Sequence, residues 1–231
     1  MAEAEDQSND NPLVSLKELL LLPADRYGKR LRAVLNEIDH LHGVPRIKPI
    51  GVKINEDRDD LGRYVKHSGT GKPLRIELSR RKNDQLELTF AHEIGHLLEA
   101  ALIPGSSFGV RKWAFDDLMR DWRFAVRSSV SFRKLENIAE TRQAATVGAD
   151  GTVTHREADP RFLSYLLEDQ ELWARSYAQY VAVSGQNSTL LEQIRPRCFP
   201  RYAIPVQWSD NEFEPILQAV DELFNRLRWR R

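Results

Sequence analysis

A short histidine motif constrains the fold of this chain more than any other feature of its sequence. His92, Glu93 and His96 form the pattern H-E-x-x-H within the segment Thr89–Glu99. On an α-helix, residues four apart lie on one face, one turn apart, so the two imidazoles can bind one Zn²⁺ from the same side. The motif therefore requires a helix, and the sequence predicts one over residues 84–102.

The surrounding residues support this helix. Asp84 and Glu87 have the spacing of a capping box, and Pro104–Gly105 is a suitable end. Gly95 lies between the histidines, where a glycine costs about 1 kcal/mol relative to alanine. We therefore expect another backbone to approach the helix closely at Gly95. The alternative is a pair of surface histidines on a stable helix.

Glu93 predicts hydrolytic chemistry. It is turned about 100° around the helix axis from His92, so it can contact a water held by the metal without binding the metal itself. Zinc lowers the pKa of a bound water to roughly 7. A neighbouring carboxylate can take the proton while the hydroxide attacks a carbonyl carbon, and can then pass it to the leaving amine. Glu93 is therefore the predicted general base and acid of a zinc-dependent peptidase.

A zinc site of this kind needs a third protein ligand. A third histidine six residues beyond His96 is excluded, because Leu102 stands there and Glu99 replaces the glycine that such a pattern needs. A carboxylate is therefore expected, and the downstream candidates are Glu99, Glu136, Glu140, Glu168, Asp169 and Glu171. Glu99 lies almost a turn beyond His96, so we interpret it as a hydrogen-bond partner of a histidine or as a solvated charge.

Apolar spacing predicts the remaining elements. The N-terminal region should form a leucine-rich helix, Leu16–Leu22, and a second helix capped by Asp25. Strands are expected over Pro49–Ile54, Gly62–Lys66 and Leu74–Ser79. Ser68–Lys72 lacks the spacing of a phosphate-binding loop and predicts a hairpin turn. Further helices are expected over 113–143, 170–183 and 213–227, with a proline-containing loop over 195–208 and a turn at 148–151 between short extended pieces. Helix 113–143 is predicted to form part of the cleft wall.

Composition excludes several classes of partner. The chain of 231 residues has 34 basic and 34 acidic side chains, and this balance gives no general reason to bind nucleic acid or an anionic membrane. The arginines near the C-terminus suit the end of a helix; the alternative is a nucleic-acid-binding arm, which no other basic stripe in the sequence supports. The longest aliphatic run, Leu19–Leu22, is far shorter than the ~20 residues of a membrane span. Residues 1–11 are polar, predict a disordered tail and lack the features of a signal peptide. With Cys198 as its single cysteine, the chain fits a reducing compartment, and we expect it in the cytoplasm.

Two segments together resemble a known family. The motif segment AHEIGHLLE, residues 91–99, is followed by ELWARSYA, residues 171–178. This combination resembles gluzincin-type metallopeptidase domains, in particular those found as C-terminal modules of phage head-morphogenesis proteins and large phage polyvalent proteins. The stretch Pro205–Trp229 is similar to the end of these domains, so the resemblance covers roughly residues 60–231. Because the glutamate that opens the second helix binds zinc in such domains, the resemblance implies Glu171 as third ligand.

The residues around Glu171 are consistent with this implication. Glu171 falls in the first turn of its helix, where the helix dipole favours a carboxylate. Ala174 is small and would let two helices come close, and Arg175 can pair with Glu171 at i, i+4. The alternative is a surface ion pair, and Glu168 is the leading rival as ligand. Candidates for stabilising an oxyanion are Tyr177, Tyr180, His155 and Arg175.

The sequence therefore predicts an α+β, zincin-like fold that is mainly helical, with a small antiparallel sheet over the active-site helix. Its parts would be the tail 1–11, N-terminal helices in 12–45 packed on the core, and a metallopeptidase domain in 46–231. The predicted function is Zn²⁺-dependent hydrolysis of a protein or peptide substrate. Two alternatives stay open: a phage or mobile-element module with a structural, non-catalytic zinc site, and a regulatory protease specific for one partner protein.

Overall fold

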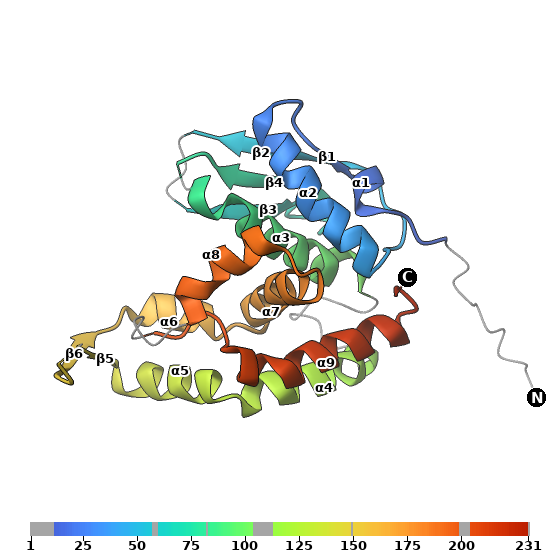
Figure 1. Cartoon of the computed structure of the whole chain (residues 1–231). Helices are drawn as coiled ribbons and strands as arrows, with labels where there is room; N and C mark the ends of the chain where they lie inside the picture. The colour runs from blue at the N-terminus through green and yellow to red at the C-terminus, as the bar shows by residue number, and fades with distance from the viewer. Residues whose placement is uncertain are drawn as a thin grey trace, which may run out of the picture.

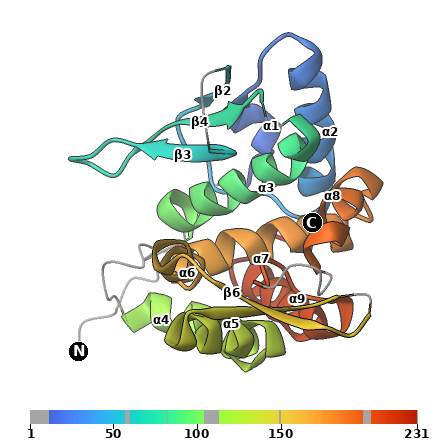
Figure 2. The ribbon, with the colours of Figure 1, turned by 90° about the vertical axis from the view of Figure 1, so that its left-hand side faces the viewer.

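The computed structural model describes residues 12–56, 60–81, 83–103, 113–148, 150–198 and 204–230. The predicted tail 1–11 and the predicted helix end at Pro104–Gly105 lie outside these residues. The structure is a mixed α+β fold (Figure 1). Figure 2 shows the sheet and helices α1 (Leu16–Leu19), α2 (Arg26–Leu41) and α3 (Leu86–Leu97) in the upper half. Helices α4 (Trp113–Ser128), α5 (Val130–Thr141) and α9 (Asp210–Arg226) lie in the lower half, and helix α7 (Asp169–Ser184) lies between the two halves.

The N-terminal region forms two helices and a short strand. Helix α1 spans Leu16–Leu19, strand β1 spans Leu20–Leu21, and helix α2 spans Arg26–Leu41. Asp25 caps α2 as predicted, because its carboxylate accepts hydrogen bonds from the backbone N–H groups of Tyr27 and Gly28. The prediction of one helix over Leu16–Leu22 is wrong beyond α1, since β1 pairs in parallel with the start of strand β2 (Ile50–Asn55).

A four-stranded sheet covers one side of helix α3. Strands β2 (Ile50–Asn55), β3 (Gly62–Lys66) and β4 (Pro73–Ser79) join β1 in the order β1-β2-β4-β3. Only the β3–β4 pair is antiparallel, and it confirms the predicted hairpin turn. The β1–β2 and β2–β4 pairs are parallel, so the prediction of an antiparallel sheet is wrong and the sheet is mixed. The physical reason is that α2 connects β1 to β2, and a helical crossover returns the chain in the same direction.

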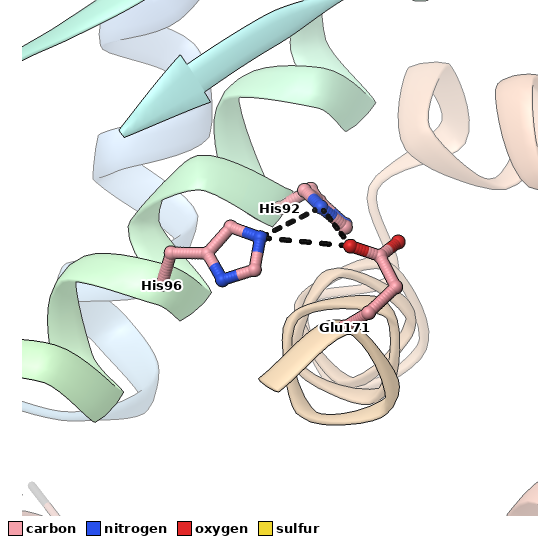
Figure 3. Close-up of side chains that lie close together, drawn as sticks. All are labelled: His92, His96 and Glu171. Atoms are coloured by element: carbon pink, nitrogen blue, oxygen red, sulfur yellow. Dashed lines mark hydrogen bonds and ion pairs between the residues drawn. The ribbon is translucent and has the colours of Figure 1, made fainter. Parts of the chain in front are cut away.

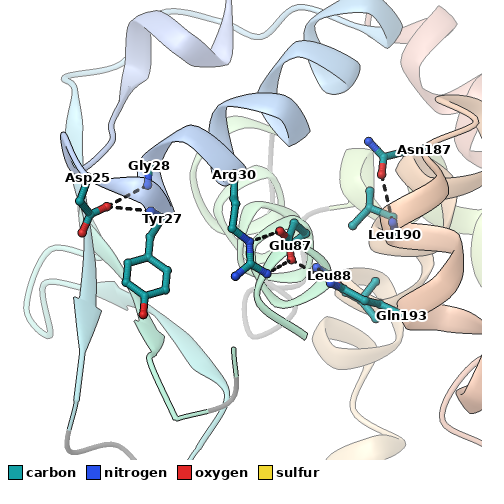
Figure 4. A network of polar contacts seen from close by, with 9 residues as sticks. All are labelled: Asp25, Tyr27, Gly28, Arg30, Glu87, Leu88, Asn187, Leu190 and Gln193. Atoms are coloured by element: carbon teal, nitrogen blue, oxygen red, sulfur yellow. Dashed lines mark hydrogen bonds and ion pairs between the residues drawn. The ribbon is translucent and has the colours of Figure 1, made fainter. Parts of the chain in front are cut away.

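The motif helix begins two residues later than the predicted cap. A 3-10 turn, Asn83–Gln85, precedes α3 (Leu86–Leu97), and a π-helical turn, Leu98–Leu102, continues it. The predicted capping box is wrong, because Gln85 occupies the N-cap position and makes no side-chain capping bond. Glu87 is instead buried and accepts hydrogen bonds from Arg30 of α2 and from Gln193 of helix α8 (Ser188–Cys198) (Figure 4). It therefore fixes three helices relative to one another.

The predicted helix 113–143 is two helices. Helix α4 spans Trp113–Ser128 and α5 spans Val130–Thr141. Ser129 separates them: its backbone is extended and its hydroxyl caps α5 by accepting from the N–H of Phe132. Gln143 already belongs to strand β5 (Gln143–Val147), which pairs with β6 (Val153–Glu157) in a separate two-stranded sheet. This hairpin confirms the predicted turn between extended pieces.

The C-terminal half is helical. Helices α6 (Pro160–Leu166), α7 (Asp169–Ser184), α8 (Ser188–Cys198) and α9 (Asp210–Arg226) follow the hairpin. The predicted helices over 170–183 and 213–227 are confirmed apart from their ends. The predicted loop over 195–208 begins too early, because α8 continues through Pro196 to Cys198.

Two hydrophobic clusters hold these elements together. The larger cluster joins apolar side chains of α1, α2, the main sheet, α3, α4, α7, α8 and α9, so the N-terminal helices share it with the C-terminal helices. The smaller cluster lies between α5, α6 and the β5–β6 hairpin and comprises Leu135, Ile138, Ala144, Ala158, Leu163 and Leu166. In the part of the chain that the structure describes, no helix combines the length and the apolarity that crossing a membrane requires.

Candidate metal centre

Helices α3 and α7 pack against each other at the histidine motif. A Cβ atom placed on Gly95 would lie 2.9 Å from the Cα of Ala174 and 3.3 Å from its carbonyl oxygen. The indole Nε1 of Trp173 donates a hydrogen bond of 2.9 Å to the carbonyl oxygen of Gly95. The expectation of a close backbone approach at Gly95 is therefore confirmed, and Ala174 is the residue that permits it.

This packing brings together the side chains of His92, His96 and Glu171 (Figure 3). The Nε2 atoms of the two histidines lie 3.2 Å apart. Oε2 of Glu171 lies 3.4 Å from Nε2 of His92 and 3.7 Å from Nε2 of His96. The histidines come from one face of α3 and the carboxylate from the first turn of α7, so two helices supply the three ligand atoms.

These donor atoms fit a tetrahedral zinc ion. With zinc–ligand bonds of about 2.0–2.1 Å, two ligands of a tetrahedral site lie about 3.3 Å apart, close to the three separations in this group. Oε2 of Glu171 is buried and accepts no hydrogen bond from the described residues. A buried carboxylate oxygen normally has a partner, and a cation between this oxygen and the two imidazole nitrogens would satisfy it.

The surroundings of Glu171 keep it ionised. Burial alone would raise the pKa of its carboxyl group, but electrostatic interactions with the adjacent side chains of His92 and His96 outweigh burial and hold the pKa well below its usual value. Arg175 contributes in the same direction, with its Nε 3.8 Å from the other carboxylate oxygen, Oε1. Both side chains are buried, so this predicted i, i+4 pair is an interior contact and not a surface ion pair.

Glu93 lies beside this group and is also buried. Burial raises the pKa of its carboxyl group to about 7, against the opposing effect of His96 and with a further increase from the negative charge of Glu171. Its Oε2 accepts no hydrogen bond from the described residues. Glu93 thus presents a carboxylate oxygen next to the donor group without being part of it.

The rival ligands lie elsewhere. Glu168 is exposed at the N-cap of α7, where its carboxylate accepts a hydrogen bond from Gln170. Glu99 is buried near Tyr64 and is therefore not a solvated charge. Neither belongs to the group of potential metal ligands found in the described residues.

The donor group opens into a cavity of about 620 Å³. His92, Glu93 and Glu171 line one part of it, and α6 and the base of the β5–β6 hairpin line another. The prediction that helix 113–143 forms a cleft wall is wrong for the described lining residues, none of which belongs to α4 or α5. Helix α4 packs instead on α9, and α5 packs against α6 and strand β5.

Most of the predicted oxyanion-stabilising residues lie away from the cavity. Tyr177 is fully buried, and its hydroxyl is 2.9 Å from Nε2 of His42. Tyr180 donates a hydrogen bond to Asp221, and His155 lies exposed on β6. Arg175 does line the cavity, but its guanidinium donates to the carbonyl oxygens of Val206 and Leu166 and so has a structural role.

Tyr165 of α6 is the functional candidate that sequence reasoning missed. It lines the cavity together with Glu171. Partial burial of its hydroxyl and the adjacent negative charge of Glu171 raise the pKa of Tyr165, so the hydroxyl keeps its proton and can donate a hydrogen bond. The Asp159-Pro160 start signal could have revealed α6, but the break between α6 and α7 hides the proximity of Tyr165 to Glu171.

Comparisons with protein-family models, with curated proteins and with solved structures found no match for this chain.

Proposed function

We propose that this protein is a zinc-dependent peptidase with a zincin-like active site. The observation that carries the proposal is the group formed by His92, His96 and Glu171, whose donor atoms are spaced for a tetrahedral ion at the wall of an open cavity. Glu93 adds a buried carboxylate at the position where a peptidase of this type needs a proton acceptor. A cavity of this size is typical of sites that bind small molecules or short peptide segments.

Each residue has a distinct role in this proposal. His92 and His96 provide two neutral nitrogen donors, and Glu171 provides the charged oxygen donor. A bound zinc ion supplies Lewis acidity, which activates a water molecule and polarises the carbonyl of the substrate. Glu93 accepts the proton of the attacking water at a carboxylate oxygen and delivers it to the leaving amine. The hydroxyl of Tyr165 donates a hydrogen bond to the oxyanion that develops on the substrate carbonyl.

Two features favour this function over a structural zinc site. Structural sites are closed by four protein ligands, whereas catalytic sites keep one position open. The described residues offer three donors, and the cavity lies on their open side. A structural site also has no need of the carboxylate of Glu93, whose Oε2 is buried without a hydrogen-bond partner among the described residues, at a cost in free energy.

Metal analysis of the purified protein tests the centre. We expect one zinc ion per chain in the wild type and in His40→Ala, which removes an exposed histidine of α2, but loss of zinc in His92→Ala and His96→Ala. Glu171→Ala should weaken zinc binding far more than Glu168→Ala or Glu99→Ala, because only the first removes a ligand. Zinc binding by Glu171→Ala with wild-type affinity would contradict the assignment of the third ligand.

Glu93→Gln separates the peptidase from a structural site. The amide has nearly the size of the carboxylate, so the variant should keep its fold and its zinc. It should lose hydrolysis by about 10²–10⁴-fold, because an amide cannot accept the proton. A proteome-derived peptide mixture, analysed by mass spectrometry, supplies the substrate. Cleavage by Glu93→Gln at the wild-type rate would refute the proposed role of Glu93.

A further inference from the structure

The cavity lies between the two hydrophobic clusters of the fold. The larger cluster contributes Leu88 of α3 and Ala178 of α7 to the cavity lining, and these are the two helices that carry the donor group. The smaller cluster contributes Ala144, Ala158 and Leu166 from the opposite side. All five are buried in the protein and have apolar side chains, so the deep part of the cavity is an apolar surface on both sides.

Apart from Glu93 and Glu171 at the metal end, the charged side chains that line the cavity are either exposed or already paired. Asp60, Arg156 and Glu157 are exposed, so they form the rim. Arg175 is buried but is held by Glu171 and by two backbone carbonyl oxygens. Arg197 donates a hydrogen bond to the side chain of Gln85. A charged group that entered the deep part would therefore be desolvated against apolar walls, which is unfavourable.

Two aromatic residues stand at the side of the cavity. Phe162 and Tyr165 lie one turn apart on α6 and line the cavity, yet they are 42% and 44% exposed. Large aromatic side chains side by side at a concave surface are typical of a site that an apolar ligand covers. Helix α6 therefore offers an apolar face toward whatever the donor group binds.

We propose that this cleft selects polypeptides that place a large apolar side chain beside the bond to be hydrolysed, with that side chain held between α6 and the apolar walls. The inference rests on the proposed peptidase function, which fixes the metal end of the cleft. It adds the substrate class: apolar residues are preferred over acidic or basic ones.

Binding of small hydroxamates to the zinc-loaded protein tests the inference without catalysis. Acetohydroxamate, 3-phenylpropanohydroxamate and the monohydroxamate of succinic acid present the same metal-binding group with a methyl, a phenyl and a carboxylate end. Burial of a phenyl ring should tighten binding by about tenfold or more over acetohydroxamate. The succinate compound should bind no more tightly than acetohydroxamate. Isothermal titration calorimetry measures all three affinities.

A matched pair of variants locates the effect on α6. Phe162→Ala removes an exposed aromatic ring that lines the cavity, and Phe124→Ala removes one that is 75% exposed on α4, outside the described lining residues. Phe162→Ala should reduce the phenyl preference by about threefold or more, with its zinc content unchanged. Phe124→Ala should keep both the preference and the zinc.

The results separate three claims: the metal centre, the preference for apolar side chains, and the role of α6. If the zinc-loaded protein binds all three hydroxamates equally, or prefers the carboxylate, the apolar selectivity is overturned while the metal centre stands. If Phe124→Ala and Phe162→Ala lower the preference equally, the assignment to α6 is overturned. If the wild-type protein takes up no zinc, the proposed function fails and this inference fails with it.

Discussion

The contact between Gly95 and Ala174 allows a sharp test of how the fold builds the site. Gly95→Ala places a methyl group 2.9 Å from a backbone atom of α7, closer than carbon atoms tolerate. In a free helix this substitution would stabilise by about 1 kcal/mol. Overpacking typically costs about 1–3 kcal/mol, so we expect a net destabilisation of about 0–2 kcal/mol. The helices must also move apart, which shifts Glu171 relative to His92 and His96.

The same substitution should also weaken zinc binding. Displacing a group that orients a metal ligand typically lowers metal affinity by about 10–100-fold. At a fixed free zinc concentration, a tenfold loss lowers the stabilisation by zinc by about 1.4 kcal/mol. Urea unfolding with and without zinc measures both quantities. Gly51→Ala is the matched control, because a Cβ at Gly51 meets nothing within 4 Å, and it should be neutral or stabilising.

A double variant sharpens this test. The nearest atoms to the new methyl group are the Cα and the carbonyl oxygen of Ala174, which remain when Ala174 is changed to glycine. Ala174→Gly should therefore fail to rescue Gly95→Ala. If Gly95→Ala raised stability as an ordinary helical substitution does and kept wild-type zinc affinity, the close approach would not position the site.

Two further predictions concern Tyr165 and Glu87. Tyr165→Phe should keep zinc and lower kcat by roughly a hundredfold, as removal of an oxyanion donor does. The control Tyr27→Phe, on the remote helix α2, should keep both zinc and kcat. A peptide assay together with metal analysis checks both variants. Burial alone would raise the pKa of Glu87, but hydrogen bonds from Arg30 and Gln193 lower it overall. The folded state thus holds the proton less readily than the unfolded state, so this contribution to stability is present above the unfolded pKa of about 4.3 and is lost as pH falls through the folded pKa. Glu87→Gln should lower the free energy of unfolding by about 1–3 kcal/mol near pH 7, and this loss should shrink toward pH 3. Urea unfolding at a series of pH values measures the loss, with the exposed Glu136→Gln as control. A difference between Glu87→Gln and the wild type that stayed constant with pH would contradict this prediction.

The local sequence pattern predicts most of the helices and the two histidine donors. The four-residue spacing of His92 and His96 can work only on a helix, and the glycine between them pointed to the contact with Ala174. Glu171 followed from a resemblance, and its burial in the first turn of α7 agrees with that assignment. For the helices and the two histidines, the decisive information lies within one or two turns of helix.

The errors arose where distant pairing decides the structure. Leu20 and Leu21 belong to an apolar run that suits a helix or a buried strand equally well, and pairing with Ile50 and Gly51 makes them a strand. Glu87 has the spacing of a capping residue, but Arg30, far away in sequence, offers it a stronger, charge-assisted partner. Such competition between local and tertiary partners cannot be read from spacing alone.

The same reasoning explains why the site depends on segments outside its motif. Glu171 divides its carboxylate between two tasks: Oε1 faces Arg175, and Oε2 faces the histidines. The i, i+4 spacing predicts the pair of Glu171 and Arg175 but not the orientation of the carboxylate. That orientation requires the guanidinium of Arg175 to be held in place. That group is fixed by the carbonyl oxygens of Leu166, at 2.6 Å, and Val206, at 3.0 Å. Because the end of α6 and the segment 204–209 before α9 hold Arg175, they also hold the third donor atom. The end of α6 thus aligns the donor group while its exposed face offers Phe162 and Tyr165 to the cavity.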